Sequence, residues 1–216
     1  MKITKYPQSC FMTESNGKRI LIDAGNLSYS PEFADEWAKA DAILITHKHG
    51  DHCYAEVLKN FNAPIYANSE VANIYPELKI NVVKSGDVLD LFDNITATVG
   101  NAYHGYIPWL KGAGEIHENI SWILEIENKK VYLTSDTICF KNDYKCDVLC
   151  APVSAHGLVM SPFEVALFAK ECGASLVLPC HADNPKFPVD FENLEEEFAK
   201  FEINYKLLKH KESIEI

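Results

Sequence analysis

The sequence predicts an α/β fold with β-sheets inside and helices on the outside. Strand-like and helix-like patterns mix in both halves of the chain, which is typical of sheets covered by helices. Residues Ala42–Ile45 form a short, continuous apolar run, and such a run is characteristic of a strand covered on both faces. The chain has 216 residues, of which 47% are hydrophobic and 24% charged, so it can bury a sizeable core.

The expected strands are apolar or alternating runs that end at turn-forming residues. In chain order they span Cys10–Glu14, Arg19–Asp23, Ala42–Ile45, Pro64–Ala67, Ile80–Lys84, Asp87–Leu91, Ile95–Val99, Trp122–Ile126, Lys129–Leu133, Asp147–Cys150 and Ser175–Leu178. Glu127 and Asn128 separate two of these strands, and that spacing predicts a hairpin. The chain closes with Ile203–Leu208.

Helices are expected where helix-forming residues follow a capping residue. Ser161 offers an N-cap, Pro162 suits the first turn, and Glu164 places an acid near the start of the next helix. The expected helices span Glu32–Lys39 after Pro31, Ala55–Asn60, a short segment after Ser69, Val165–Cys172 and Leu194–Phe201. No Gly/Ser linker, Pro-rich stretch or long charge block divides the chain, so no domain boundary is predicted.

The charge balance and the cysteines limit the class of protein. The net charge of −11 argues against broad attraction to nucleic acid or to an anionic membrane surface. No apolar run approaches the roughly 20 residues of a membrane span, and the first residues lack the apolar stretch of a signal peptide. The seven cysteines are odd in number and form no Cys-x-x-Cys pair, so we expect a reduced, cytoplasmic protein.

A cluster of polar residues follows the apolar run at Ala42–Ile45. It contains three imidazoles and one carboxylate within six residues: His47, His49, Asp51 and His52. Because open α/β sheets bind ligands beyond the carboxyl ends of their strands, this position suits an active site. A loop can turn all four side chains toward a divalent metal, and Gly50 lets the backbone bend between them.

The pattern His-x-His-x-Asp-His after a short apolar strand resembles the signature of the metallo-β-lactamase fold superfamily. Other landmarks of the superfamily follow in order along nearly the whole chain: Leu21–Gly25, Ala102–Gly105, Tyr132–Thr137 and Leu178–His181. Val177–His181 after a helix is similar to the branch that contains the ascorbate-phosphate lactonase and many metal-dependent hydrolases. The resemblance implies a four-layer αβ/βα sandwich, with two mixed sheets inside and helices outside, as a single hydrolase domain over residues 1–216.

The resemblance also implies two divalent metal ions held by imidazoles and carboxylates. One ion would take His47, His49 and His104, the other would take Asp51, His52 and His181, and Asp136 would bridge them. This donor set suits zinc first, with manganese or iron as alternatives. Asp23 would support the metal loop from outside the ligand set.

Two metals about 3.5–4 Å apart can hold a hydroxide at neutral pH and stabilise the attacking and leaving oxygens. Asp51 is the natural acceptor of the nucleophile's proton, because it would be both a ligand and a carboxylate. We therefore expect hydrolysis of a small ester, lactone or phosphodiester. Two alternatives remain: an iron-dependent redox enzyme of the same fold, similar to the persulfide dioxygenases, and a non-catalytic, metal-stabilised binding module.

Further residues are candidates for substrate contacts. His156 follows the Asp147–Cys150 strand and is interpreted either as a general acid or anion ligand, or as a loop histidine without a role; His117 carries the same two interpretations. The Tyr106–Trp109 segment is either a substrate wall or a small satellite core. Cys180 is expected to pack in the core, and His210 to be solvated.

The expected partner is a small molecule. The lactonase branch usually carries a small-polar-arginine segment after its histidine, whereas this chain has Gly105 to Pro108 there, which disfavours a phosphorylated sugar. Few basic residues lie near the motif, chiefly Lys48 and Lys111, so a nucleic-acid substrate is disfavoured as well. We expect no membrane partner, and the sequence leaves the oligomeric state open.

Overall fold

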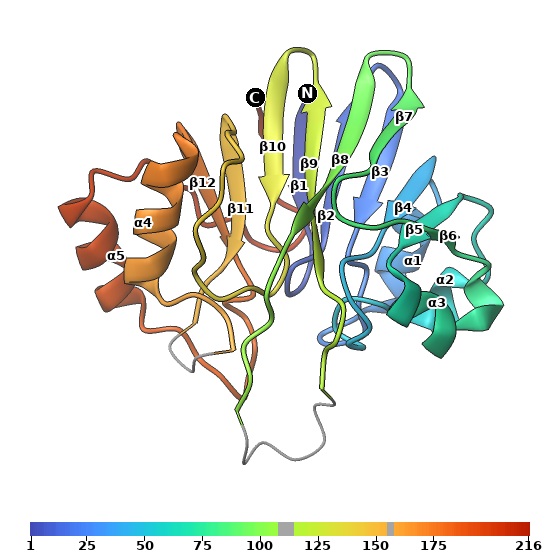
Figure 1. Cartoon of the computed structure of the whole chain (residues 1–216), viewed down its shortest axis with the longest axis horizontal. Helices are drawn as coiled ribbons and strands as arrows, with labels where there is room; N and C mark the ends of the chain where they lie inside the picture. Colours follow the sequence, from blue (N-terminus) through green and yellow to red (C-terminus); the bar gives the residue numbers. More distant parts are fainter. Residues whose placement is uncertain (108–114, 155–157) are drawn as a thin grey trace.

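Two mixed β-sheets face each other in the computed structural model, which describes residues 1–107, 115–154 and 158–216 (Figure 1). The first sheet has seven strands in the order β13-β1-β2-β3-β4-β5-β6. Their bounds are β1 Lys2–Lys5, β2 Phe11–Ser15, β3 Lys18–Ile22, β4 Ala42–Leu44, β5 Ile65–Ala67, β6 Asn81–Val82 and β13 Ser213–Glu215. The pairs from β13 to β3 are antiparallel, and those from β3 to β6 are parallel.

The second sheet has six strands in the order β12-β11-β10-β9-β8-β7. Their bounds are β7 Val88–Phe92, β8 Ile95–Asn101, β9 Ile120–Ile126, β10 Lys129–Leu133, β11 Val148–Pro152 and β12 Leu176–Cys180. The pairs from β7 to β10 are antiparallel, and those from β10 to β12 are parallel. Glu127 and Asn128 join β9 to β10 with φ values of 53° and 62°, so the predicted two-residue hairpin is confirmed.

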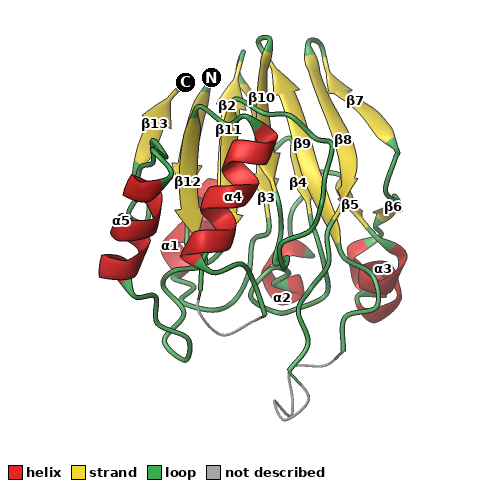
Figure 2. Ribbon diagram, turned by 60° about the vertical axis from the view of Figure 1, so that its left-hand side comes forward, coloured by secondary structure: helices red, strands yellow, loops and turns green. Residues whose placement is uncertain are grey.

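Helices cover the outer face of each sheet (Figures 1 and 2). On the first sheet they are α1 Pro31–Trp37, α2 Ala55–Leu58, α3 Ser69–Ile74 and the 3-10 helix η1 Pro76–Leu78; on the second they are α4 Pro162–Cys172 and α5 Phe191–Lys200. The predicted start of α4 is confirmed, because the Ser161 side chain accepts from the Glu164 N–H while the Glu164 side chain accepts from the Ser161 N–H.

Alternating side chains of the strands divide the apolar residues into three clusters. Between the sheets, Ile20 and Leu44 meet Trp122 and Leu124. The neighbouring Leu21 packs on the other face of the first sheet, under the helices that cover it.

The outer clusters join each sheet to its helices. Phe33 and Trp37 of α1 pack against the first sheet. Phe168 of α4 and Phe198 of α5 belong to the corresponding cluster on the second sheet. The predicted order of layers, helices-sheet-sheet-helices, is therefore confirmed.

The structure adds two strands that the sequence pattern does not reveal. β1 and β13 pair with each other, Ile3 with Ile214, although 211 positions separate them in the chain. The side chains of Ile3 and Lys5 both point into the protein. Because Lys5 is charged, the sequence of β1 lacks the alternation of apolar and polar residues that would predict a strand. Residues 203–208, the last expected element, form no regular strand or helix. Within this segment Tyr205 makes an isolated β-bridge to Val177.

The loops that follow β3, β4, β8, β10 and β12 gather at one edge of the two sheets, opposite the chain termini (Figure 1). The polar motif at residues 47–52 belongs to the loop after β4. All seven cysteines have free thiols. No helix within the described ranges is long and apolar enough to cross a membrane.

Packing between the sheets gives a test of the fold. Leu124 is fully buried there, so Leu124→Ala is expected to lower the free energy of unfolding by about 2–5 kcal/mol. Val88 of the outer strand β7 is 63% exposed, and Val88→Ala is expected to change it by only about 0.5 kcal/mol. Urea unfolding of both variants measures the difference, and equal losses would contradict the assigned core.

Candidate metal centre

Seven histidine and aspartate side chains predicted from the sequence lie in two neighbouring groups at the edge described above. The first group contains His47, His49 and His104; the second contains Asp51, His52, Asp136 and His181. Within each group, one candidate ligand atom from every residue lies within 4.8 Å of those of the others. The structure thus brings together residues that are 134 positions apart in the chain.

The first group consists of three imidazoles. Nε2 of His47 lies 3.1 Å from Nδ1 of His49. The ring centroid of His104 lies 5.3 Å from that of His47 and 4.9 Å from that of His49. His104 comes from the loop after β8 in the second sheet, whereas the other two follow β4 in the first, so this group spans both sheets.

The second group combines two imidazoles with two carboxylates. Nε2 of His181 lies 3.2 Å from Oδ2 of Asp51 and 3.2 Å from Oδ2 of Asp136. Nε2 of His52 lies 3.3 Å from Oδ1 of Asp136. The ring centroids of His47 and His52 are 4.1 Å apart, so the two groups are adjacent.

Hydrogen bonds outside the groups orient the histidine rings. Nδ1 of His104 lies 2.7 Å from the carbonyl oxygen of Gly105, and a carbonyl can only accept, so Nδ1 carries the proton. Nδ1 of His52 lies 2.9 Å from a carboxylate oxygen of Asp23 in the same way. In both residues Nε2 is then the nitrogen available to a metal ion, as in metal-binding histidines.

The Asp23 carboxylate fixes the loop that carries the motif. It accepts hydrogen bonds from the backbone N–H and the hydroxyl of Thr46, both at 2.8 Å, in addition to the one from His52. Asp23 is only 1% exposed and is not part of either group of candidate ligands. It therefore occupies the supporting position expected from the sequence.

A glycine allows two loops to come together beside the groups. A Cβ atom at Gly25 would lie 1.8 Å from the carbonyl oxygen of Asp51, so no other residue fits without a shift of the backbone. The next residue, Asn26, donates its N–H to the carbonyl of Gly50 at 2.7 Å. The chain after β3 is thereby attached to the middle of the motif.

Three strands end in residues with left-handed backbone conformations. Asp23 after β3 has φ 48°, Ser135 after β10 has φ 66°, and His181 after β12 has φ 57°. Residues other than glycine adopt this region at an energetic cost, and such residues cluster at functional sites. Each of these conformations changes the direction of the chain at a residue of the site. For Ser135, the residue that turns inward is its neighbour Asp136.

Burial and charge give the histidines and carboxylates different proton affinities. Burial and the neighbouring His52 hold the pKa of His47 well below its usual range, and burial lowers that of His104. Burial favours the neutral carboxyl groups, but His181 and His52 outweigh it: the pKa of Asp51 falls to about 2, and that of Asp136 well below its ordinary value. His47 and His104 are therefore held as neutral imidazoles, and Asp51 and Asp136 as ionised carboxylates.

This donor set fits a pair of divalent cations. Burial opposes charge on His52 and His181 too, but the nearby carboxylates raise the pKa of both histidines. Metal binding at such histidines displaces their protons and uses the same nitrogen atoms. Imidazole and carboxylate ligands are those that zinc, manganese and iron accept in proteins.

Other polar residues of the site were not found from the sequence. The Ser9 hydroxyl lies 3.4 Å from Oδ1 of Asp136, and the Asn119 amide donates to the Asp136 carbonyl at 2.8 Å. The Ser135 hydroxyl lies 2.8 Å from Oδ1 of Asn119 and 3.3 Å from Nδ1 of His47. Only the position of Ser135 beside Asp136 is a local signal; the other residues come from distant parts of the chain.

The histidines outside the two groups differ in their location and contacts. His156 lies outside the described residues. The backbone N–H of His117 donates to Glu70 at 3.1 Å. His210 is exposed at the surface, as expected, and its Nε2 lies 2.7 Å from a carboxylate oxygen of Asp183.

The other residues singled out in the sequence differ in their burial and contacts. Cys180 is 3% exposed, so its predicted packing is confirmed. Tyr106 is 69% exposed, while Pro108, Trp109 and Lys111 are outside the described residues. Lys48 is ion-paired with Glu70 at 2.6 Å.

Comparison with known sequences identifies related proteins. A family model described as a beta-lactamase superfamily domain matches residues 2–181. The chain is 31% identical over 196 residues to a UPF0173 metal-dependent hydrolase from Geobacillus thermodenitrificans, and the match covers 84% of this chain and 85% of that relative.

Two solved structures with related folds differ in their chemistry. Igni18, a metallo hydrolase from Ignicoccus hospitalis, matches with a TM-score of 0.79 and 21% identity, over 99% of this chain and 97% of its own. CmlA, a diiron β-hydroxylase from Streptomyces venezuelae, matches with a TM-score of 0.76 and 12% identity, over 100% of this chain and 54% of its own. At these identities, both comparisons show a shared fold.

The contacts of Asp23 lead to a prediction about metal binding. Asp23→Asn keeps the size of the side chain but replaces an accepting oxygen with an NH2 group, so at least one of its three hydrogen bonds is lost. Zinc affinity is expected to fall about 10–100-fold, as for other residues that orient a ligand. Competition with a chromophoric chelator measures this, and Asp35→Asn on the exposed side of α1 is the control with the same charge change. Equal affinities in the two variants would contradict the role of Asp23.

Proposed function

This chain belongs to the beta-lactamase superfamily, and on that basis we propose that residues 1–216 act as a metal-dependent hydrolase of a small ester, lactone or phosphodiester. One observation carries the proposal: two adjacent groups of imidazoles and carboxylates converge at the edge between the sheets. Core packing does not explain seven such side chains in one place, because burying polar groups without partners costs free energy.

Each group is assigned one divalent metal ion, zinc in the first instance. His47, His49 and His104 would hold one ion, Asp51, His52 and His181 the other, and Asp136 both. When bound, such a metal pair supplies positive charge that activates water and stabilises the oxygens of the bond under attack. Adjacency of the groups supports this assignment, as does the 3.2 Å approach of Asp136 to His181.

Asp51 is the proposed acceptor of the proton of the attacking water. Its side chain is 22% exposed, against 5% for Asp136, so of the two carboxylates in the group Asp51 is the one that solvent reaches. Its pKa of about 2 keeps it ionised at neutral pH. His181 contacts the Asp51 carboxylate and is itself contacted by Asp136. These contacts hold the Asp51 carboxylate in a position from which it can orient the attacking water and then accept its proton.

The substrate is proposed to be a small molecule. The net charge of −11 opposes a long anionic polymer, and Lys48 is already paired with Glu70. His156 follows β11, and we keep it as a candidate general acid or anion ligand. Tyr103 and Tyr106, both more than half exposed after β8, are candidates for the wall of the substrate site.

Iron-dependent redox chemistry is the second candidate. The same donor types accept iron, and the fold is shared with a diiron β-hydroxylase. The family relationship to metal-dependent hydrolases favours hydrolysis.

A substrate panel tests the reaction class. Zinc-loaded protein is assayed on a phosphodiester, a phosphomonoester, a lactone and a thioester, and we expect turnover of one class. Asp136→Asn is expected to lower kcat/KM by about 100-fold or more, because it removes an ionised ligand from both metals. Asp143→Asn, an exposed carboxylate, is the matched control. Turnover that persists in Asp136→Asn would place the chemistry elsewhere.

Metal content tests the dinuclear assignment. We expect about two zinc ions per chain in reconstituted protein and about one in His104→Ala, since that variant loses a ligand of one group only. Removal of metal by a chelator should abolish turnover, and zinc should restore it. His117→Ala, an exposed histidine outside both groups, should keep two ions. Oxygen consumption by iron-loaded protein, without hydrolysis by the zinc form, would favour the redox alternative.

A further inference from the structure

Lys5 is a buried lysine outside the two groups of the candidate metal centre. It is only 4% exposed, and its side chain points inward from β1. The amine donates to the carbonyl oxygen of Tyr6 and, at 2.6 Å, to that of Gln8. Because an enclosed ammonium group loses its hydration, a lysine in this position must be compensated by such contacts.

The turn that Lys5 holds has an unfavourable conformation. Gln8 has φ 55°, in the left-handed region. Its side chain is fully buried, and neither amide atom has a hydrogen-bond partner within the described parts of the chain. The backbone N–H of Gln8 donates to both carboxylate oxygens of Asp183 at 3.1 Å. Such a turn persists only where its surroundings hold it.

The same turn contacts the last histidine of the candidate metal centre. The carbonyl oxygen of Gln8 accepts the backbone N–H of His181 at 3.0 Å, in addition to the Lys5 amine. His181 has φ 57°, so its backbone also adopts a conformation that needs support. One carbonyl group thus joins the buried lysine to His181.

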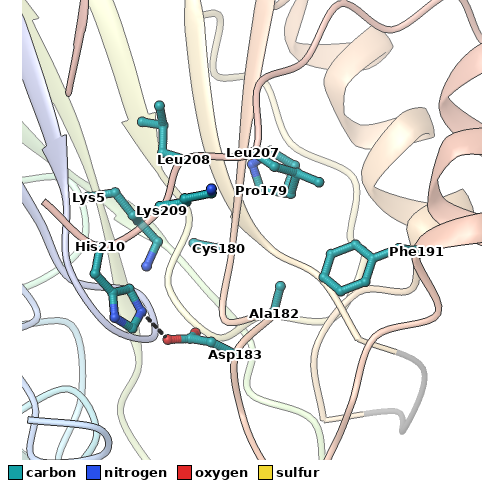
Figure 3. Close-up of a pocket in the computed structure, with 10 residues that line it drawn as sticks. All are labelled: Lys5, Pro179, Cys180, Ala182, Asp183, Phe191, Leu207, Leu208, Lys209 and His210. Carbon is teal, nitrogen blue, oxygen red and sulfur yellow. Dashed lines mark hydrogen bonds and ion pairs between the residues drawn. The ribbon is translucent and has the colours of Figure 1, made fainter. Parts of the chain in front are cut away.

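A cavity of about 560 Å³ lies beside this arrangement (Figure 3). Lys5, Cys180 and Asp183 line it, and the ion pair between Asp183 and His210 closes one side. Cys180 and Ala182 line the cavity but His181 between them does not, so the His181 side chain points away from it. Space next to Lys5 allows a longer side chain at this position.

We propose that Lys5 is a positioning residue for His181: its ammonium group fixes the Gln8 carbonyl, which in turn fixes the backbone from which His181 reaches the second metal. The inference rests on the proposed function for the role of His181 as a ligand. The role concerns the second group, because the Gln8 carbonyl accepts hydrogen bonds from the Lys5 amine and from the backbone N–H of His181, a member of that group.

Two measurements on the full chain test the proposal separately. Hydrogen exchange of the His181 amide, in protein without added metal, reports the Gln8–His181 contact directly. Lys5→Met, which removes the donor, is expected to speed this exchange about tenfold or more beyond any change in global unfolding. Lys5→Arg keeps the donors, fits beside the cavity and is expected to restore slow exchange. Lys2→Met on the same strand is the matched control.

Zinc titration then tests the consequence for the site. In Lys5→Met, one of the two zinc affinities is expected to fall about 10–100-fold while the other is unchanged. If Lys5→Met does not fold, Lys5→Gln, whose shorter side chain lacks the ammonium group, is measured in its place, and a loss in the same direction is expected.

The outcomes separate this inference from the proposed function. Unchanged exchange at His181, or faster exchange at all amides in proportion to lower stability, would overturn the positioning role. Equal loss of both zinc affinities would overturn it too. If the unsubstituted protein bound no zinc, the proposed function would fail, while the exchange data would still decide whether Lys5 holds His181.

Discussion

The candidate site depends on one architectural constraint: two sheets share a single core, so the ends of their strands meet along a common edge. Ile20 and Leu44 on one side and Trp122 and Leu124 on the other fix the distance between the sheets. The loops after β4, β8, β10 and β12 then supply imidazoles and carboxylates to the same space. Neither sheet carries the whole set, so the site exists only when both are packed together.

Polar groups enclosed at this edge are stabilised mainly by pairing with one another. Asp23 accepts a hydrogen bond from His52 and orients its ring, while Asp51 and Asp136 face His181. The left-handed conformations at Asp23, Ser135 and His181 bring these partners together at strand ends, where a regular strand would carry them past each other. Local backbone strain is thereby offset by electrostatic pairing in the same place.

The N-terminal strand adds a layer of support behind the site. Through Lys5 and Gln8, β1 is connected to the end of β12, the last strand of the other sheet. On its other side β1 pairs with β13, the edge strand of the first sheet. The N-terminal strand thus leads to a turn that contacts His181, even though the N-terminus lies at the opposite edge of the sheets (Figure 1).

Much of the fold and the motif at residues 47–52 could be predicted from local signals in the sequence, whereas His104, Asp136 and His181 were predicted from the family resemblance. The apolar run before His47, the hairpin at Glu127 and Asn128, and the capping box of α4 each lie within a few consecutive residues. Tertiary structure alone decided the rest. β13 pairs with a strand more than 200 positions away, Ser9 and Asn119 reach Asp136 from distant loops, and Lys5 breaks the apolar pattern of β1. These contacts follow from how the two sheets pack, and no local pattern of residues records that packing.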